Sequence, residues 1–459
     1  MRRLNSSIRW LLATACVWLT TNGIEAVVPT FQPPQKPATF VAVPGGNFIY
    51  IHDTSIDGSG NLIAVWGEMG TKDLTLKVAI LPHEGMWSES TVLYHVDDMQ
   101  TLGSTPVPRI AMNAQGEALV VWHEQLGPDK FAIKSAQYSS GKWSALEDLH
   151  PQSAYNPIVT LNEAGYAVAA WTAVSGGDTL IQASTLAAGQ STWSKEVTIS
   201  SAEGGWNSDV DLALNDAGNT IAVWNYHNLS VQAAMLPYQG QWTTPVTVTP
   251  NPGEWSNWPK VVMNASGYAV AVWLSGEGQY ANIQAATVQF GQSWSQPACL
   301  TTHVKNRQGL SAAIDSQGNA IAIWSESEAL IFGQTSSPYL QISRLPYGKT
   351  WSTPDYPAPK KVYSLLGKVA FDENGNAVTA WYNAKFDDPA NVTAAFHTTV
   401  LPNGGHWSGH QKFSVAQHNG FFSLGITPSG SAVISWLSSE NTILAAKWKP
   451  FITIYELKP

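Results

Sequence analysis

The chain is 459 residues long, carries 21 tryptophans, and has only 12% charged residues. This composition excludes a disordered chain, because the apolar fraction is ample, and it favours an all-β protein. The formal net charge of −9 disfavours nucleic acid as a partner, because the phosphate backbone would repel an acidic surface.

The first 26 residues have the composition of a secretory signal. Three arginines among the first nine residues form a basic region, residues 10–21 form a short apolar run, and a cleavage motif ends at Ala26. We therefore predict a signal peptide over 1–26 and an exported protein (periplasmic, cell-surface or extracellular), with no membrane insertion after cleavage. An uncleaved anchor is the alternative, although the apolar run is shorter than the ~20 residues of a spanning helix.

The chain has two cysteines, Cys16 and Cys299. Cys16 lies in the predicted signal, so the exported chain would keep one cysteine and form no internal disulfide. We expect Cys299 to be a buried apolar residue.

A Pro-rich lead-in over 27–36 precedes a motif that recurs eight times. The motif is a polar turn, a short apolar run and a tryptophan, and its clearest copy is NDAGNTIAVW at 215–224. Successive copies are 49 to 57 residues apart, a period that indicates propeller blades. The copies end at Trp66, Trp122, Trp171, Trp224, Trp273, Trp324, Trp381 and Trp436.

One repeat, 208–250, divides into four predicted strands. These strands are 209–214, 220–224, 230–236 and 245–249. Gly218 supplies the positive φ of the first hairpin turn. The second strand is apolar at successive positions, as expected of a strand buried on both faces. A second motif, tryptophan followed by serine or threonine, precedes the fourth strand in seven repeats, at Trp87, Trp143, Trp193, Trp242, Trp294, Trp351 and Trp407.

The eighth repeat lacks the second motif, so another segment must complete it. Residues 36–46 (KPATFVAVPGG) resemble the fourth-strand segment 243–253, which favours completion by the N-terminal segment. Such closure leaves no blade edge unpaired. The alternatives are that 451–457 (FITIYEL) supplies the strand, or that seven blades carry an appended hairpin.

The predicted fold is therefore all-β: an eight-bladed β-propeller of four-stranded antiparallel blades, closed by pairing of the N- and C-terminal segments. We expect a single domain over 37–459. Its repeats are predicted at about 46–100, 101–150, 151–202, 203–251, 252–302, 303–359, 360–413 and 414–459.

The second motif carries a family resemblance. YGKTWS at 347–352 resembles the end of an Asp-box, the turn between the third and fourth strands of sialidase-like (BNR-repeat) propeller blades. The box aspartate is missing in every copy; at Trp351, Pro346 stands in its place. The resemblance implies a divergent member of that superfamily, and the catalysis of the family does not follow from it.

The residues that a sialidase would need are largely absent. The resemblance would imply three arginines around a substrate carboxylate, but only Arg109, Arg307 and Arg344 follow the signal. The position of Arg109 holds Ile158, Asp211 or Lys260 in other repeats, and Arg344 falls in a third strand, away from the axis.

No pair of carboxylates stands out for acid–base chemistry. His406 and His410 flank a predicted turn and share no helical face. We predict no catalytic residue, no metal site and no cofactor, and we lean against an enzyme.

Tryptophans that break the repeat pattern indicate a binding site. Fifteen tryptophans belong to the two motifs; Trp206, Trp255 and Trp258 instead lie on predicted connectors between blades. Such connectors share a face with the loops between second and third strands, where repeat four has Tyr226 and His227.

We therefore predict ligand binding by Trp206, Tyr226, His227, Trp255 and Trp258. Aromatic faces beside amides and carboxylates suit a glycan, and exposed aromatic side chains suit a protein partner. Local packing against the blade rims is the third interpretation. The predicted function is an exported, monomeric, non-catalytic binding module for a glycan or an extracytoplasmic protein, and the alternative is a divergent glycoside hydrolase or lyase.

Overall fold

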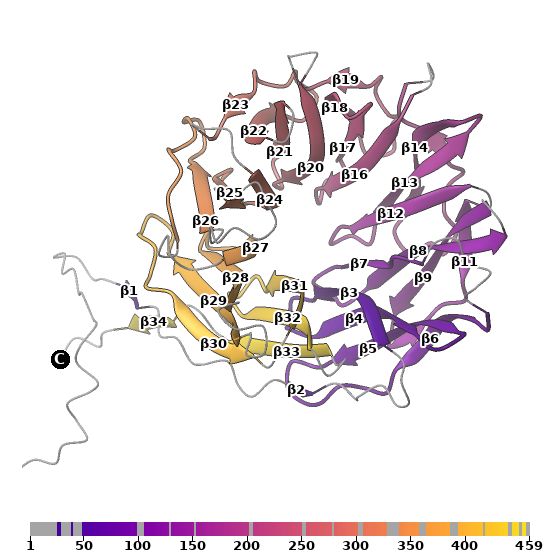
Figure 1. The fold of residues 1–459 in the computed structure, drawn as a ribbon, viewed down its shortest axis with the longest axis horizontal. Coiled ribbons are helices and arrows are strands. Elements are labelled where there is room, and N and C mark those ends of the chain that lie inside the picture. Colours follow the sequence, from indigo (N-terminus) through magenta and orange to yellow (C-terminus); the bar gives the residue numbers. More distant parts are fainter. Residues whose placement is uncertain are drawn as a thin grey trace, which may run out of the picture.

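A computed structural model of the chain shows a closed ring of β-sheets around a central axis (Figure 1). The structure describes residues 25–28, 38–39, 48–98, 105–127, 130–150, 153–201, 205–249, 254–277, 280–301, 306–327, 339–357, 364–385, 393–415, 418–438, 443–448 and 452–455. All regular elements in these ranges are strands. Within the same ranges, no helix has the length and apolarity of a membrane span.

The first four blades follow one another along the chain. Blade 1 contains β3 (Phe48–Ile56), β4 (Leu62–Met69), β5 (Leu74–Leu81) and β6 (Thr91–Val96). Blade 2 contains β7 (Arg109–Met112), β8 (Ala118–Gly127) and β9 (Lys130–Ser139), with β10 (Lys142–Trp143) and β11 (Glu147–His150) both paired to β9. Blade 3 contains β12 (Ala154–Leu161), β13 (Ala167–Ser175), β14 (Asp178–Leu186) and β15 (Val197–Thr198). Blade 4 contains β16 (Asn207–Leu214), β17 (Thr220–Tyr226), β18 (Ser230–Leu236) and β19 (Val246–Thr247).

The other four blades complete the ring. Blade 5 contains β20 (Trp255–Met263), β21 (Tyr268–Glu277), β22 (Tyr280–Gln289) and β23 (Ala298–Cys299). Blade 6 contains β24 (Asn306–Ile314), β25 (Ala320–Ser327) and β26 (Tyr339–Leu345), and an isolated bridge from Ile342 to Asp355 takes the place of its fourth strand. Blade 7 contains β27 (Ser364–Phe371), β28 (Ala377–Lys385), β29 (Thr393–Leu401) and β30 (Gln411–Val415). Blade 8 contains β31 (His418–Ile426), β32 (Ala432–Ser438), β33 (Ile443–Trp448) and β2 (Ala38–Thr39). The eight-bladed antiparallel propeller is confirmed.

N-terminal closure of the ring is confirmed as well. Ala38 pairs with Ala445 and Thr39 with Leu444, so β2 is the outer strand of blade 8. The C-terminal strand β34 (Ile452–Tyr455), the alternative candidate, pairs instead with β1 (Glu25–Val28) in a separate two-stranded sheet. Most of the predicted signal and of the lead-in lies outside the described residues, and both remain predictions.

The second strands form the core because neighbouring blades bury both of their faces. In β17, Ala222 and Trp224 pack toward blade 3, whereas Ile221 and Val223 pack toward blade 5. All eight tryptophans of the first motif are at most 1% exposed. Burial of this kind stabilises by about 2 to 3 kcal/mol per large side chain, which explains the unbroken apolar run.

The polar turn of the first motif links the blades to each other. In blade 4, the Oδ1 of Asn215 accepts the backbone N–H of Asn219 at 3.0 Å, and its Nδ2 donates to the carbonyl of Ala265 in blade 5 at 3.4 Å. Where aspartate opens the turn, as Asp315 does, its carboxylate instead accepts the backbone N–H and the side-chain amide of Asn319, both at 2.8 Å.

The second motif bonds to the third strand of its own blade through a pair of hydrogen bonds in the seven blades that carry it. The N–H of Thr243 donates to the carbonyl of Met235 at 2.8 Å, and the N–H of Met235 donates to the Thr243 hydroxyl at 3.0 Å. The hydroxyl residue of every copy makes the same pair with its third strand. The serine or threonine therefore continues the sheet ladder after the loop.

One expectation about the outer strands is wrong. Cys299 ends β23 and its side chain is exposed, because a fourth strand has a neighbouring strand on one side only. The placement of Arg344 is confirmed: it lies in β26, a third strand.

Candidate functional site

The first strand of each blade lines the central axis (Figure 1). A bulge interrupts this strand near its start in every blade except blade 2, whose described first strand has none. Five bulge residues occupy equivalent positions in consecutive blades and have a left-handed backbone. They are Asn156 (φ 52°), Asp209 (φ 53°), Trp258 (φ 51°), Gly309 (φ 66°) and Leu366 (φ 55°). Bulges of this kind turn a side chain away from the sheet, and they recur beside functional sites.

Trp258 does not fit the backbone that this position imposes. Glycine, asparagine and aspartate tolerate a left-handed conformation, and they occupy three of the five positions. A bulky aromatic residue there is an outlier that costs on the order of 1 to 2 kcal/mol. The residue is not placed there for full burial, because Trp258 is 55% exposed.

The bulges of blades 3 to 6 border a cavity of about 500 Å³ on the axis. This volume lies within the usual range for small-ligand sites. Trp258, Asp209 and Asn156 meet Arg109 and Lys260 in its wall. The remaining lining residues are Val107, Pro157, Ile158, Val210, Pro259, Leu274, Gly309 and Leu310. An exposed indole thus shares one cavity with a carboxylate, an amide and two cations.

Asp209, which lines the cavity, is exposed. Burial, and after it the negative charge of Asp209, raise the pKa of the Tyr155 phenol.

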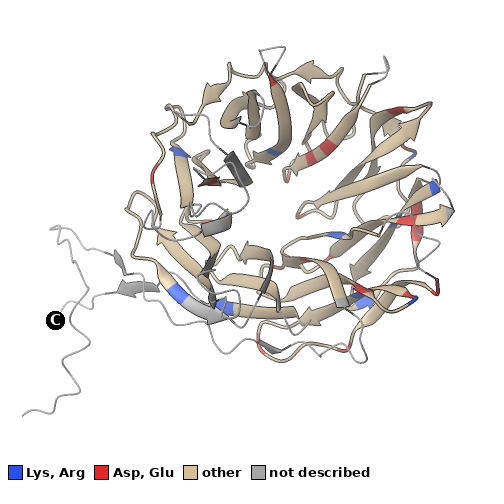
Figure 2. Cartoon of the chain, viewed as in Figure 1, with Lys and Arg blue, Asp and Glu red and all other residues tan. Residues whose placement is uncertain are grey.

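Five blades carry a charged residue at one level of the first strand, opposite the residue that precedes the motif tryptophan, and these five form a charged axial ring: Asp53, Arg109, Asp211, Lys260 and Lys368. Figure 2 shows residues of both signs on strands that line the axis. The two aspartates, Asp53 and Asp211, connect neighbouring blades. Asp211 accepts the backbone N–H of Val261 at 2.9 Å and the Nζ of Lys260 at 3.1 Å. Asp53 accepts the N–H of Ile110 at 3.2 Å in the same way.

The charges of the other ring members act on Lys368. Burial, and then the neighbouring charge of Lys260, lower the pKa of the Lys368 amine, whereas Asp53 raises it. Burial raises the pKa of Asp53, and Arg109 opposes that shift most strongly. The sequence analysis identified Arg109, Asp211 and Lys260 only as occupants of one variable repeat position. It did not identify Asp53 and Lys368, which occupy the same position.

Three of the predicted site residues lie together on the rim of blade 4. The carbonyl of Trp206 accepts the backbone N–H of His227 at 2.6 Å. The rings of Tyr226 and His227 meet edge to face, with centroids 4.2 Å apart. Trp206 is 68% exposed and His227 is also exposed, whereas Tyr226 is half-buried.

The two other predicted residues, Trp255 and Trp258, both lie in β20, but they have different surroundings. Trp255 is half-buried against the core between blades 5 and 6. Trp258 lines the axial cavity. The five residues therefore form a rim group and an axial member, with Trp255 in the packing between blades.

A buried amide network connects the rim of blade 4 to the strand of Trp258. The fully buried Asn225 donates to the Oδ1 of Asn228 at 3.0 Å and to the Oδ1 of Asn257. The carbonyl of Asn228 accepts the N–H of Ser256 at 3.1 Å. The residues directly before Trp258 are therefore held in place by blade 4.

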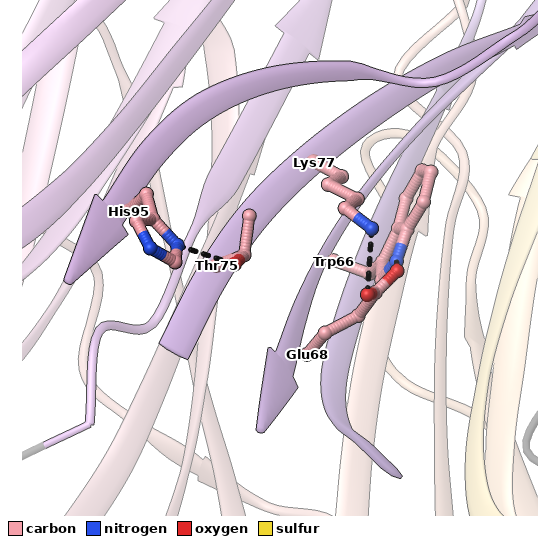
Figure 3. Close-up of polar contacts among 5 residues, drawn as sticks. All are labelled: Trp66, Glu68, Thr75, Lys77 and His95. Atoms are coloured by element: carbon pink, nitrogen blue, oxygen red, sulfur yellow. Dashed lines mark hydrogen bonds and ion pairs between the residues drawn. The ribbon is translucent and has the colours of Figure 1, made fainter. Parts of the chain in front are cut away.

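One other polar cluster, in blade 1, is internally paired. In blade 1, the 4% exposed Glu68 accepts the indole N–H of Trp66 at 2.8 Å and pairs with Lys77 at 2.7 Å (Figure 3). Both of its oxygens have partners, which indicates a structural role. No group of three metal-ligating side chains occurs among the described residues.

Comparisons with known proteins bear on the fold. No protein-family model matches the sequence, and a search of curated proteins gives no match. The structure is similar to the BP39L lectin from Burkholderia pseudomallei, with a TM-score of 0.50 and 12% identity over 76% of this chain and 98% of the lectin.

Two carbohydrate-cleaving proteins are also similar. An α-L-arabinanase from Penicillium chrysogenum has a TM-score of 0.43 and 10% identity, over 75% of this chain and 92% of its own. An ulvan lyase has a TM-score of 0.48 and 11% identity, over 72% and 90%. At these identities the similarity shows the propeller fold alone, and the sialidase-like superfamily remains a resemblance.

Proposed function

We propose that the protein is an exported, monomeric, non-catalytic β-propeller that binds a glycan in its axial cavity. The observation that carries this proposal is Trp258. Its left-handed backbone is unfavourable, its side chain is 55% exposed, and it lines the cavity. A strained residue without full burial supports a functional role, because ligand contact then supplies what packing does not.

The chemistry of the cavity favours a sugar. The C–H face of a sugar ring stacks on an indole, while its hydroxyls need donors and acceptors close by. Asn156 and Asp209 supply amide and carboxylate groups next to Trp258, and Arg109 supplies donors. A protein partner is less well supported, because hot spots occur in broad desolvated interfaces, not in a polar concave site.

The carboxylates favour binding over hydrolysis. Glycoside hydrolysis uses two carboxyl groups that flank the scissile bond. Asp209 is the one carboxylate among the residues described as lining the cavity. Asp53 and Asp211 each accept a backbone N–H of the next blade, which occupies them structurally. A hydrolase or lyase is therefore the second reading.

The proposal is tested by replacing Trp258 with a residue that suits its backbone. Trp258→Asn should abolish retention of glycans on an array without unfolding the protein. The free energy of unfolding should change by no more than about 1 kcal/mol, since the relief of left-handed strain offsets the buried surface that is lost. Array binding and chemical denaturation of the same preparation measure both effects.

Leu366→Asn is the matched control. It changes the equivalent bulge in blade 7 to the same residue, and Leu366 is not among the residues that line the cavity. This variant should retain glycans like the wild type. Undiminished retention by Trp258→Asn would refute the proposed site, and turnover of chromogenic glycosides that is lost in Asp209→Asn would favour the enzyme.

A further inference from the structure

We infer that the binding site takes an extended oligosaccharide, which runs from the axial Trp258 across the hairpin of blade 4 to Trp206. This inference rests on the proposed function and adds the class of ligand: a chain contacted along its length, as opposed to one terminal sugar. It assigns Trp206 to the same ligand as Trp258.

The two tryptophans stand on one continuous backbone surface. The carbonyl of Trp206 accepts the N–H of His227 at 2.6 Å, and the carbonyl of Asn228 accepts the N–H of Ser256 at 3.1 Å. Blade 4 therefore bridges the strand that follows Trp206 and the strand that carries Trp258. Trp206 and Trp258 are 68% and 55% exposed.

The span between them exceeds one sugar ring. The connected path crosses two interstrand hydrogen bonds and three residue steps. At about 4.8 Å per strand spacing and about 3.3 Å per residue, this path is up to roughly 20 Å long. Occupying both aromatic faces requires several linked sugars.

The surface between the tryptophans offers hydrogen-bonding groups. Asp209 follows Trp206 by three residues, lies in β16 and lines the cavity. His227 and Asn228, at the hairpin tip, are exposed. Carboxylate, imidazole and amide groups thus lie along the path that a chain would take, and these groups suit a hydroxyl-rich polymer.

The path is also rigid. Asn225 holds both the hairpin and the strand of Trp258, through Asn228 and Asn257. The N–H of Asn228 donates back to the Oδ1 of Asn225 at 2.9 Å. A prearranged surface loses little conformational entropy when a ligand binds, which favours a second contact far from the first.

The test is a chain-length series measured by isothermal titration calorimetry. The probes are cello-, xylo-, chito- and arabino-oligosaccharides from monosaccharide to hexasaccharide, with wild type, Trp206→Ala and Trp258→Ala. For the series that binds, the hexasaccharide should bind about tenfold more tightly than the disaccharide, because a second aromatic contact adds on the order of 1 kcal/mol. Trp206→Ala should remove this gain and leave disaccharide affinity unchanged, whereas Trp258→Ala should abolish binding of both.

Tyr347→Ala is the control, because Tyr347 is a 56% exposed aromatic residue in a turn at the opposite end of the blades. It should bind every length like the wild type. Equal affinities for disaccharide and hexasaccharide, or an equal loss for both in Trp206→Ala, would overturn the extended-ligand inference while glycan binding stands. Failure of the wild type on all four series would overturn the proposed function and this inference together.

Discussion

At the scale of single residues, the left-handed bulge gives the axial site its character. Asn156, Asp209 and Gly309 meet the backbone requirement at no great cost, whereas Trp258 does not. The sequence separates Trp258 from the structural tryptophans because it falls outside both motifs. The bulge itself follows from strand register, which no local sequence signal reveals.

The residues of the charged axial ring have a constant spacing from the motif tryptophans. Asp53, Arg109, Asp211, Lys260 and Lys368 each stand thirteen residues before a motif tryptophan. The constant spacing places them at one level of the axis, as the strand registers confirm. Counting back from every tryptophan would therefore have found the ring, although not that the two aspartates bind backbone amides.

One buried histidine makes stability sensitive to acid. His52 is 8% exposed, and burial lowers its pKa to about 4, opposed by a contact with the backbone of Ser435. Because the folded pKa lies below that of the unfolded chain, the unfolded chain takes up the proton first. Stability is then complete above about pH 6.5 and falls as the pH drops towards 4.

We predict that His52→Gln weakens this pH dependence. The stability lost by wild type between pH 7 and pH 4 should exceed that lost by the variant, by up to about 3 kcal/mol. Urea denaturation at a series of pH values measures the difference. Identical pH profiles for the two proteins would show that His52 does not titrate in this range.

At the scale of elements, both sequence motifs have direct structural causes. The polar turn bonds one blade to the next, and the hydroxyl after the second tryptophan continues the ladder of its own blade. The first function recurs with the turn in each repeat and the second in the seven repeats that carry the second motif, so repetition identified these residues as structural. The fourth strand of blade 4 was predicted too long, at 245–249 against Val246–Thr247. It begins one residue late because Pro245 lacks the N–H that a ladder needs.

Closure by β2 is an element whose contribution can be isolated. A chain that begins at residue 37 keeps the pairing of Ala38 and Thr39 with β33, and a chain that begins at residue 41 loses it. We predict that the shorter chain melts several degrees lower, since lost ladder hydrogen bonds cost on the order of 1 kcal/mol each. The chain that begins at residue 37 is the control, because both chains lack β1. Equal melting temperatures would mean that β2 contributes nothing to the ring.

At the scale of the whole molecule, a second set of contacts joins the first and last blades. Lys447 in β33 donates to the carbonyls of Gly60 at 2.9 Å and Pro82 at 2.7 Å, both in blade 1. Burial lowers the pKa of this lysine to about 8. The ring is thus closed by strand pairing on its outside and by a cation between blades 8 and 1.

The blade number, blade order and closure could be predicted because the repeat encodes them. The cavity could not, because five blades contribute to it and no single segment carries its signature. The prediction of one aromatic cluster placed all five residues on one face without regard to their depth. Along the first strand of blade 5, Trp255 turns into the packing and Trp258 into the cavity.

The central claim, a glycan on the axis against Trp258, is tested most directly by a crystal structure with an oligosaccharide that the protein retains. The account predicts a sugar ring stacked on the Trp258 indole, with hydroxyls in hydrogen-bonding range of Asp209 and Asn156. A second hollow, of about 890 Å³, lies at the outer edge of blades 3 and 4 beside Trp242. Sugar density there, with none against Trp258, would contradict the account.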